Sequence, residues 1–95
     1  MVTLVVRFTF APEDRTEMEE AVRLLAVESR KEPGCVTFVP HRVEGDPDTL
    51  VLYEQYRDEK AQAAHRASQH FRKYVVEGLF QRMKERNLEN LVALV

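Results

Sequence analysis

Three residues in the second half of the chain have side chains suited to proton transfer. Glu54 lies within a mostly apolar stretch, and His65 and His70 follow it. A carboxylate in apolar surroundings must be hydrogen-bonded, paired or protonated, because burying an isolated charge is costly. Burial also raises its pKa and suits it to general-base work, and an imidazole can shuttle protons at neutral pH. We therefore predict acid–base chemistry, with His65, His70 or Glu54 as the base.

Each of these residues also has a structural explanation. Glu54 could form a hydrogen bond with His65 or with a helix N-terminus, and His65 could cap the end of a short helix, where a positive charge is favourable. Together with Glu54 the two histidines form a two-histidine, one-carboxylate set of the kind that binds non-haem iron. Their spacing of five positions across a helix break is not diagnostic of a metal site. We expect His41 to face solvent from a strand.

Aromatic side chains near these positions could form a flat apolar wall: Tyr56, Phe38, Phe71 and Tyr74. Flat apolar substrates suit such pockets. For Phe38 and Tyr74, ordinary core packing is the alternative explanation. Arg42 and Arg72 are the cations that we consider for holding a phosphate or an enolate.

Length and composition limit the classes of protein to consider. The chain has 95 residues, so we expect a single domain over residues 1–95. A net charge of −2 excludes the basic footprint of a nucleic-acid binder. No apolar run approaches the ~20 residues of a membrane span, and no signal peptide is recognisable. Cys35 is the only cysteine, which favours a reducing cytoplasm.

Hydrophobic periodicity predicts the elements that position these residues. Strict alternation over 2–10 indicates a strand, and similar stretches at 35–43 and 49–57 indicate two more. We expect the helix-facing residues of the second strand to be Val36, Phe38 and Pro40, and those of the third to include Glu54 and Tyr56. An apolar C-terminal stretch, 91–95, predicts a fourth strand.

Helices are predicted between these strands. One begins near Pro12 and ends before Pro33-Gly34, which is a strong stop signal. Asp58 can cap a short helix that runs to about Ala67, and Ser68 can cap a second helical segment.

The predicted order is β-α-β-β-α-β, which is the α+β, ferredoxin-like arrangement with two helices on one face of a four-stranded antiparallel sheet. The other sheet face would carry Val5, Val51 and Tyr53, and further along Val92 and Leu94. An open apolar face is a liability in a monomer. We therefore expect a homodimer that forms through this sheet face and the C-terminal strand.

Several stretches resemble the antibiotic biosynthesis monooxygenase family over nearly the whole chain. They are Glu32-Pro33-Gly34-Cys35, Leu52-Tyr53-Glu54-Gln55-Tyr56 and Asp58-Glu59-x-Ala61-x-x-x-His65-x-x-Ser68-x-His70-Phe71. The resemblance implies a dimeric α+β barrel and no metal. The family includes cofactor-independent monooxygenases of quinols, haem-degrading enzymes and an isomerase of a phosphorylated autoinducer.

The resemblance also helps to choose among these chemistries. Haem-degrading members carry Asn at the position that matches Val6 of this chain, and Trp where it has Tyr56; the chain has no Trp. We therefore do not expect haem degradation, and we include Val6 and Tyr56 among the substrate-binding candidates. No glycine-rich nucleotide loop is present, so no cofactor is expected.

Our leading hypothesis is a cofactor-independent monooxygenase that oxidises a quinol or another dihydroxyaromatic compound with O2. The alternatives are an isomerase of a phosphorylated dicarbonyl compound, for which Arg42 and Arg72 would be discriminating, and a non-catalytic dimer that binds a small molecule.

Overall fold

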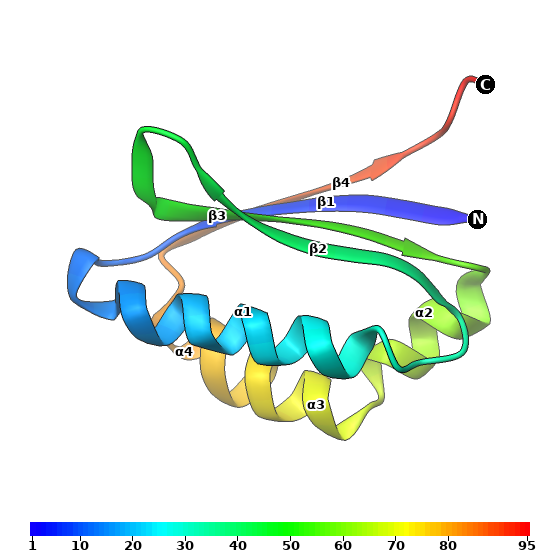
Figure 1. The fold of residues 1–95 in the computed structure, drawn as a ribbon, viewed down its shortest axis with the longest axis horizontal. Coiled ribbons are helices and arrows are strands. Elements are labelled where there is room, and N and C mark those ends of the chain that lie inside the picture. The colour runs from blue at the N-terminus through cyan, green and yellow to red at the C-terminus, as the bar shows by residue number, and fades with distance from the viewer.

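An antiparallel sheet of four strands forms one layer of the molecule, and all the helices cover one of its faces (Figure 1). The computed structural model describes all of residues 1–95. The strands are β1 (Val2–Thr9), β2 (Cys35–Val43), β3 (Asp46–Tyr56) and β4 (Glu85–Leu91), in the spatial order β2-β3-β1-β4. This is the predicted ferredoxin-like topology.

The helical layer consists of one long helix and one interrupted segment. The first part is a short 3-10 turn, η1 (Pro12–Asp14), that continues into α1 (Arg15–Ser29). The second part comprises α2 (Glu59–Arg66), α3 (Gln69–Phe71), a π-helical stretch η2 (Arg72–Leu79) and α4 (Phe80–Arg82). None of these helices is long and apolar enough to cross a membrane.

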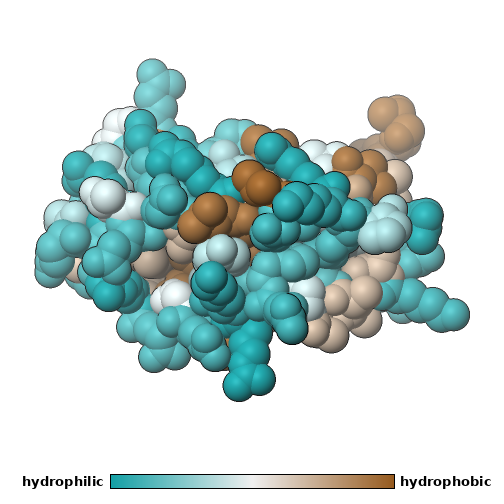
Figure 2. Space-filling view, turned by 60° about the horizontal axis from the view of Figure 1, so that its bottom comes forward, coloured by the Kyte–Doolittle hydropathy of each residue, from teal (hydrophilic) through white to brown (hydrophobic).

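The hydrophobic core lies between the sheet and the helices. Alternate residues of β1 supply it, as the period-two pattern predicts, because successive side chains of a strand point to opposite faces. The buried residues that form the central cluster are Phe8, Phe10, Met18, Val22, Leu25, Ala26, Phe38, Leu50, Leu52, Val75 and Leu79. Viewed from the helix side, the surface is mainly hydrophilic and is interrupted by small apolar patches (Figure 2).

The start of β2 differs from the prediction. Val36 was expected to face the helices, but its side chain is 52% exposed. The register between β2 and β3 shifts between Cys35 and Thr37, and Cys35 packs against the core instead. An irregularity of this kind reverses the inward and outward positions that simple alternation predicts.

The fourth strand also differs from the prediction. The sheet uses Glu85–Leu91, and residues 92–95 lie beyond it. Leu91 pairs with Thr3, so the residues that follow Leu91 have almost no β1 backbone left to pair with. The apolar stretch 91–95 was therefore a wrong indicator of the strand, which is instead a polar edge strand. Charged edge strands are common because they discourage further pairing.

Candidate active site

A cavity of about 250 Å³ lies between the helix-facing side of the sheet and the segment from α2 to α4. Apolar residues form most of its lining, among them Leu4, Val6, Leu52, Phe71, Val75 and Leu79. Six polar or charged side chains also line it: Glu54, Tyr56, Gln62, His65, Arg66 and Arg86. A mostly apolar cavity with a few convergent polar groups is typical of a small-molecule site.

Glu54 and Tyr56 form a buried hydrogen-bonded pair on the cavity wall. They are two positions apart on β3, so both side chains point toward the helices. The Tyr56 hydroxyl donates to Glu54 Oε1 at 2.6 Å, and the two residues are 6% and 0% exposed. Burial raises the pKa of Glu54 to about 7, although the Tyr56 hydrogen bond and the positive charge of Arg66 oppose this rise. Glu54 can therefore exchange a proton near neutral pH.

Tyr56 is the hydrogen-bond donor of this pair and does not exchange its proton. Its burial and the neighbouring Glu54 carboxylate raise the pKa of the phenol above its ordinary value of 10. Tyr56 therefore stays protonated and acts as a hydrogen-bond donor at neutral pH.

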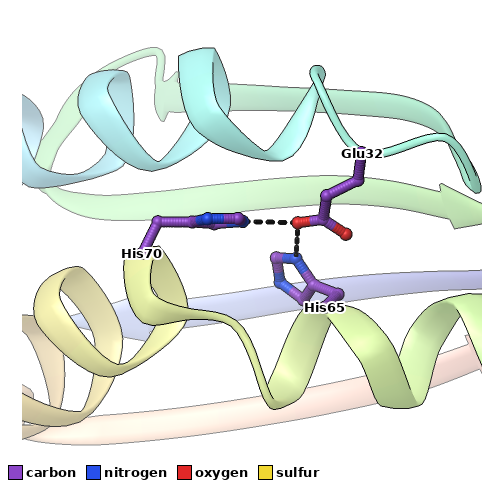
Figure 3. Close-up of side chains that lie close together, drawn as sticks. All are labelled: Glu32, His65 and His70. Atoms are coloured by element: carbon purple, nitrogen blue, oxygen red, sulfur yellow. Dashed lines mark hydrogen bonds and ion pairs between the residues drawn. The ribbon is translucent and has the colours of Figure 1, made fainter.

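A second polar cluster lies beside this pair and brings together the α1–β2 loop, α2 and α3. His65 Nδ1 lies 2.8 Å from Glu32 Oε2, and His70 Nε2 lies 2.5 Å from the same oxygen. Figure 3 shows both imidazole rings directed at the carboxylate, one from α2 and one from α3. Glu32 belongs to the loop that connects α1 with β2.

Local sequence explains why these three residues meet. Gly34 is buried against α2, where a Cβ atom in its place would overlap the Cβ of Ala61. The Arg57 N–H also donates to the Gly34 carbonyl at 2.8 Å. The absence of a side chain at Gly34 thus lets the loop carrying Glu32 approach α2 closely.

The helix break between the two histidines is built by Ser68. Its hydroxyl donates to the His65 carbonyl at 2.6 Å and accepts from the Phe71 N–H at 3.1 Å. Ser68 therefore ends α2 and caps α3, as predicted. Asp58 likewise caps α2, by accepting from the Ala61 N–H at 2.8 Å.

His65 is enclosed by aromatic rings. The centroids of Tyr56, Phe71 and Phe38 lie 5.0, 5.3 and 5.7 Å from its ring centroid. Burial lowers the pKa of His65, which outweighs the opposing effect of Glu32. Because a carboxylate only accepts hydrogen bonds, the neutral imidazole donates from Nδ1 and keeps its lone pair on Nε2.

The structure brings five of the eight predicted site residues to the cavity: Glu54, His65, Tyr56, Phe71 and Val6. The other three lie outside its lining. His70 contacts Glu32, and Phe38 is buried in the core. Tyr74 packs against the edge of the core, with Lys73 Nζ 5.3 Å from its ring centroid.

Some expected partners are different. No hydrogen bond joins Glu54 to His65, because each has another partner. Arg42 pairs with Glu19 at 2.7 Å, and Arg72 pairs with Glu77 at 3.2 Å, neither of them on the cavity wall.

Other charged residues of the site were not predicted. Glu32 precedes Pro33-Gly34, and a carboxylate in a turn usually indicates a solvated surface. Arg66 and Arg86 are well separated in the sequence, and nothing in their spacing reveals a shared cavity. The one available signal for Glu32 was its place in the stretch that resembles the family.

Comparison with known proteins identifies the family. Residues 1–77 match the family described as antibiotic biosynthesis monooxygenase. The protein named "Putative monooxygenase YcnE" of Bacillus subtilis is 30% identical over 78 residues, which cover 82% of each chain. A solved structure titled "Putative antibiotic biosynthesis monooxygenase from Nitrosomonas europaea" is 26% identical, with a TM-score of 0.92 and full coverage of both chains.

A second solved structure, PA3566 from Pseudomonas aeruginosa, is 28% identical with a TM-score of 0.91 and covers 99% of this chain and 94% of its own. The similarity thus extends over the sheet and the helices. This chain belongs to the antibiotic biosynthesis monooxygenase family.

Proposed function

We propose that this protein is a cofactor-independent monooxygenase that oxidises a quinol or another dihydroxyaromatic compound with O2. The observation that supports it most is Glu54, a buried carboxylate with a pKa raised to about 7 on the wall of an apolar cavity. Such a group can remove a phenolic proton inside a mostly apolar cavity. The names of the related proteins support monooxygenase activity as the reaction class.

The first step is proton removal from the substrate. Ionised Glu54 accepts a hydroxyl proton, and the resulting phenolate lies in an apolar cavity that also contains the positive charge of Arg66. A positive charge near the developing anion stabilises it. The phenolate is electron-rich and can reduce O2 directly, which explains how the reaction proceeds with no bound cofactor.

The remaining steps balance for 1,4-dihydroxynaphthalene as substrate. The phenolate and O2 form a carbon–oxygen bond at the adjacent ring carbon, and the outer oxygen takes the proton from Glu54. Glu54 then accepts the hydrogen of that ring carbon as a proton while the O–O bond breaks. The departing hydroxide takes this proton and leaves as water. One oxygen atom enters the ring, giving a hydroxyquinone, and O2 accepts all four electrons that the ring loses.

The aromatic residues on the cavity wall would hold the ring. Phe71 and Tyr56 offer flat surfaces, and Val6 adds an apolar contact from β1. We assign Phe38 and Tyr74 to the packing behind this wall. His65 would orient the substrate from the α2 side, and His70 would act through Glu32 to hold His65 in place.

Oxygen uptake by the purified, chelator-treated protein tests this proposal. The panel is 1,4-dihydroxynaphthalene, menadiol and a benzohydroquinone, with uptake in the absence of protein subtracted. We expect protein-dependent uptake that Glu54→Gln abolishes and that Glu20→Gln, a change at an exposed glutamate of α1, leaves intact. Uptake that is equal in both variants would exclude Glu54 as the base.

The assembly that we propose is a homodimer in the cytoplasm. The sheet face opposite the helices carries the partly exposed apolar residues Val5, Val51 and Tyr53. Beyond β4, Val92 and Leu94 are 86% and 95% exposed. A second copy would remove this apolar surface from water. The free thiol of Cys35 supports a reducing compartment.

One observation favours a second candidate, an isomerase of a phosphorylated dicarbonyl compound. Arg66 and Arg86 line the cavity, and neither forms an ion pair with an acidic side chain. A guanidinium of this kind can bind a phosphate. These two residues replace Arg42 and Arg72 as the cations that would discriminate for such a substrate. Proton exchange on a phosphorylated diketone under argon would support the isomerase over the oxygenase.

A dimer that binds a small molecule without changing it is the third possibility. It predicts that Glu54→Gln alters no rate for any compound that the protein binds. Turnover by the wild-type protein that this variant loses would exclude it.

A further inference from the structure

We propose that Glu32, His65 and His70 form a binding site for a divalent transition-metal ion such as Zn²⁺. The site lies where the α1–β2 loop meets the ends of α2 and α3 (Figure 3). It is distinct from the Glu54–Tyr56 pair and does not rest on the proposed oxygenase reaction.

The chemistry of the three ligand atoms supports this site. Two imidazole nitrogens and one carboxylate oxygen all lie within 4.8 Å of one another. Ions such as Zn²⁺, Ni²⁺ and Co²⁺ favour imidazole nitrogen and also accept carboxylate oxygen. A set of three protein ligands leaves further coordination positions for water.

The backbone is arranged so that the two imidazoles converge. On a continuous α-helix, residues five positions apart point about 140° away from each other. Ser68 interrupts the helix between His65 and His70, through its bonds to the His65 carbonyl and the Phe71 N–H. The two rings thereby reach the same carboxylate, with centroids 5.9 Å apart.

The surroundings hold the three ligands in place and still leave access. The side chains of His65, Glu32 and His70 are 4%, 15% and 18% exposed. The Glu32 N–H donates to the Ser29 carbonyl at 3.0 Å, and the close packing of Gly34 on Ala61 fixes the loop against α2. Partial burial limits competition from water, while His70 stays accessible to an incoming ion.

The hydrogen bonds within the cluster indicate how an ion would enter. Both imidazoles now donate their N–H groups to Glu32 Oε2. An ion would replace these two protons and bind the nitrogens through their lone pairs, with each ring proton moving to the other nitrogen. Binding through these two nitrogens therefore needs a tautomer change of each ring and a small opening of the cluster.

Calorimetric titration of the chelator-treated protein with ZnCl2 tests the proposal, and titration with CoCl2 supplies a spectroscopic readout. We expect saturable binding of one ion per chain, and Co²⁺ absorption bands without the intense band of a thiolate ligand. His70→Ala and Glu32→Gln should each weaken binding at least about tenfold. His41→Ala and Cys35→Ser, which change the other histidine and the single cysteine, should leave it unchanged.

The opposite results would overturn the site. These are the absence of saturable binding, binding that survives both ligand variants, or binding that His41→Ala or Cys35→Ser removes. His70 is at the edge of the cluster, so its variant keeps the assay interpretable even if a change at buried His65 prevents folding. Circular dichroism of each variant in the presence of chelator verifies that it is folded.

Discussion

Glu54→Gln should have opposite effects on activity and on stability. The variant keeps the size of the side chain and an oxygen that can accept the Tyr56 hydroxyl, but it has no carboxylate to take a proton. Loss of a general base reduces rates by about 10²- to 10⁴-fold. We expect this loss in kcat/KM for oxygen uptake.

The stability effect follows from the pKa of Glu54. The folded-state value of about 7 lies above the ordinary value of 4.5, so the folded state binds this proton more tightly than the unfolded state. The protonated carboxyl contributes its full stabilisation below pH 4.5, and this contribution is lost as the pH rises through 7. The loss amounts to about 3 kcal/mol, from the difference between the two pKa values.

Urea unfolding of both proteins at a series of pH values measures this effect. The free energy of unfolding of Glu54→Gln, relative to wild type, should rise by about 3 kcal/mol between about pH 4 and about pH 8. Other titrating groups are common to both proteins and cancel in the difference. A difference that does not change with pH would refute the raised pKa, and activity within about threefold of wild type would refute Glu54 as the base.

Three further changes test the surrounding structure. Tyr56→Phe removes the hydrogen bond that lowers the pKa of Glu54, so the pH at which kcat/KM reaches half its maximum should move to a more alkaline value; an unchanged pH profile would contradict the pairing. Gly34→Ala inserts a methyl group where the loop packs on α2 and should destabilise the protein by about 1–3 kcal/mol in urea unfolding. Gly45→Ala isolates the other cause of a glycine requirement, because open space surrounds Gly45 and the cost there comes from its positive φ of 81° alone; a Gly34→Ala protein as stable as wild type would count against the close packing. Val51→Lys on the open sheet face should convert the proposed dimer to a monomer in analytical ultracentrifugation, and an unchanged mass would argue for another interface.

Local patterns predicted most of the fold. The alternation in β1 and β3, the caps at Asp58 and Ser68 and the stop at Pro33-Gly34 are all read from neighbouring residues, and the structure contains each of them. The predictions failed where the pairing between strands distant in the sequence determines the local structure. The start of β2 is irregular, and β4 is fixed by its hydrogen bonds to β1 rather than by apolar content. The π-helical stretch η2 could not be predicted either, because the periodicity that indicates a helix assumes 3.6 residues per turn.

The candidate site was predictable in residue type but not in partnership. Glu54 attracts attention because a carboxylate on a buried strand face is unusual, and the structure places it on the cavity wall. Its partner was predicted wrongly: His65 or a helix N-terminus was expected, and the structure pairs Glu54 with Tyr56, two positions along the same strand. Glu32 was missed because its contact with His65 spans 33 positions and depends on the close approach of the α1–β2 loop to α2.

The most direct test of the central claim is the fate of isotopically labelled oxygen. The protein would turn over 1,4-dihydroxynaphthalene under oxygen-18 gas, and mass spectrometry would follow the product. We predict one labelled oxygen atom in the hydroxyquinone and the other in water, with Glu54→Gln forming no product above background. A product without the label, or hydrogen peroxide formed in equal amount to a simple quinone, would contradict a monooxygenase.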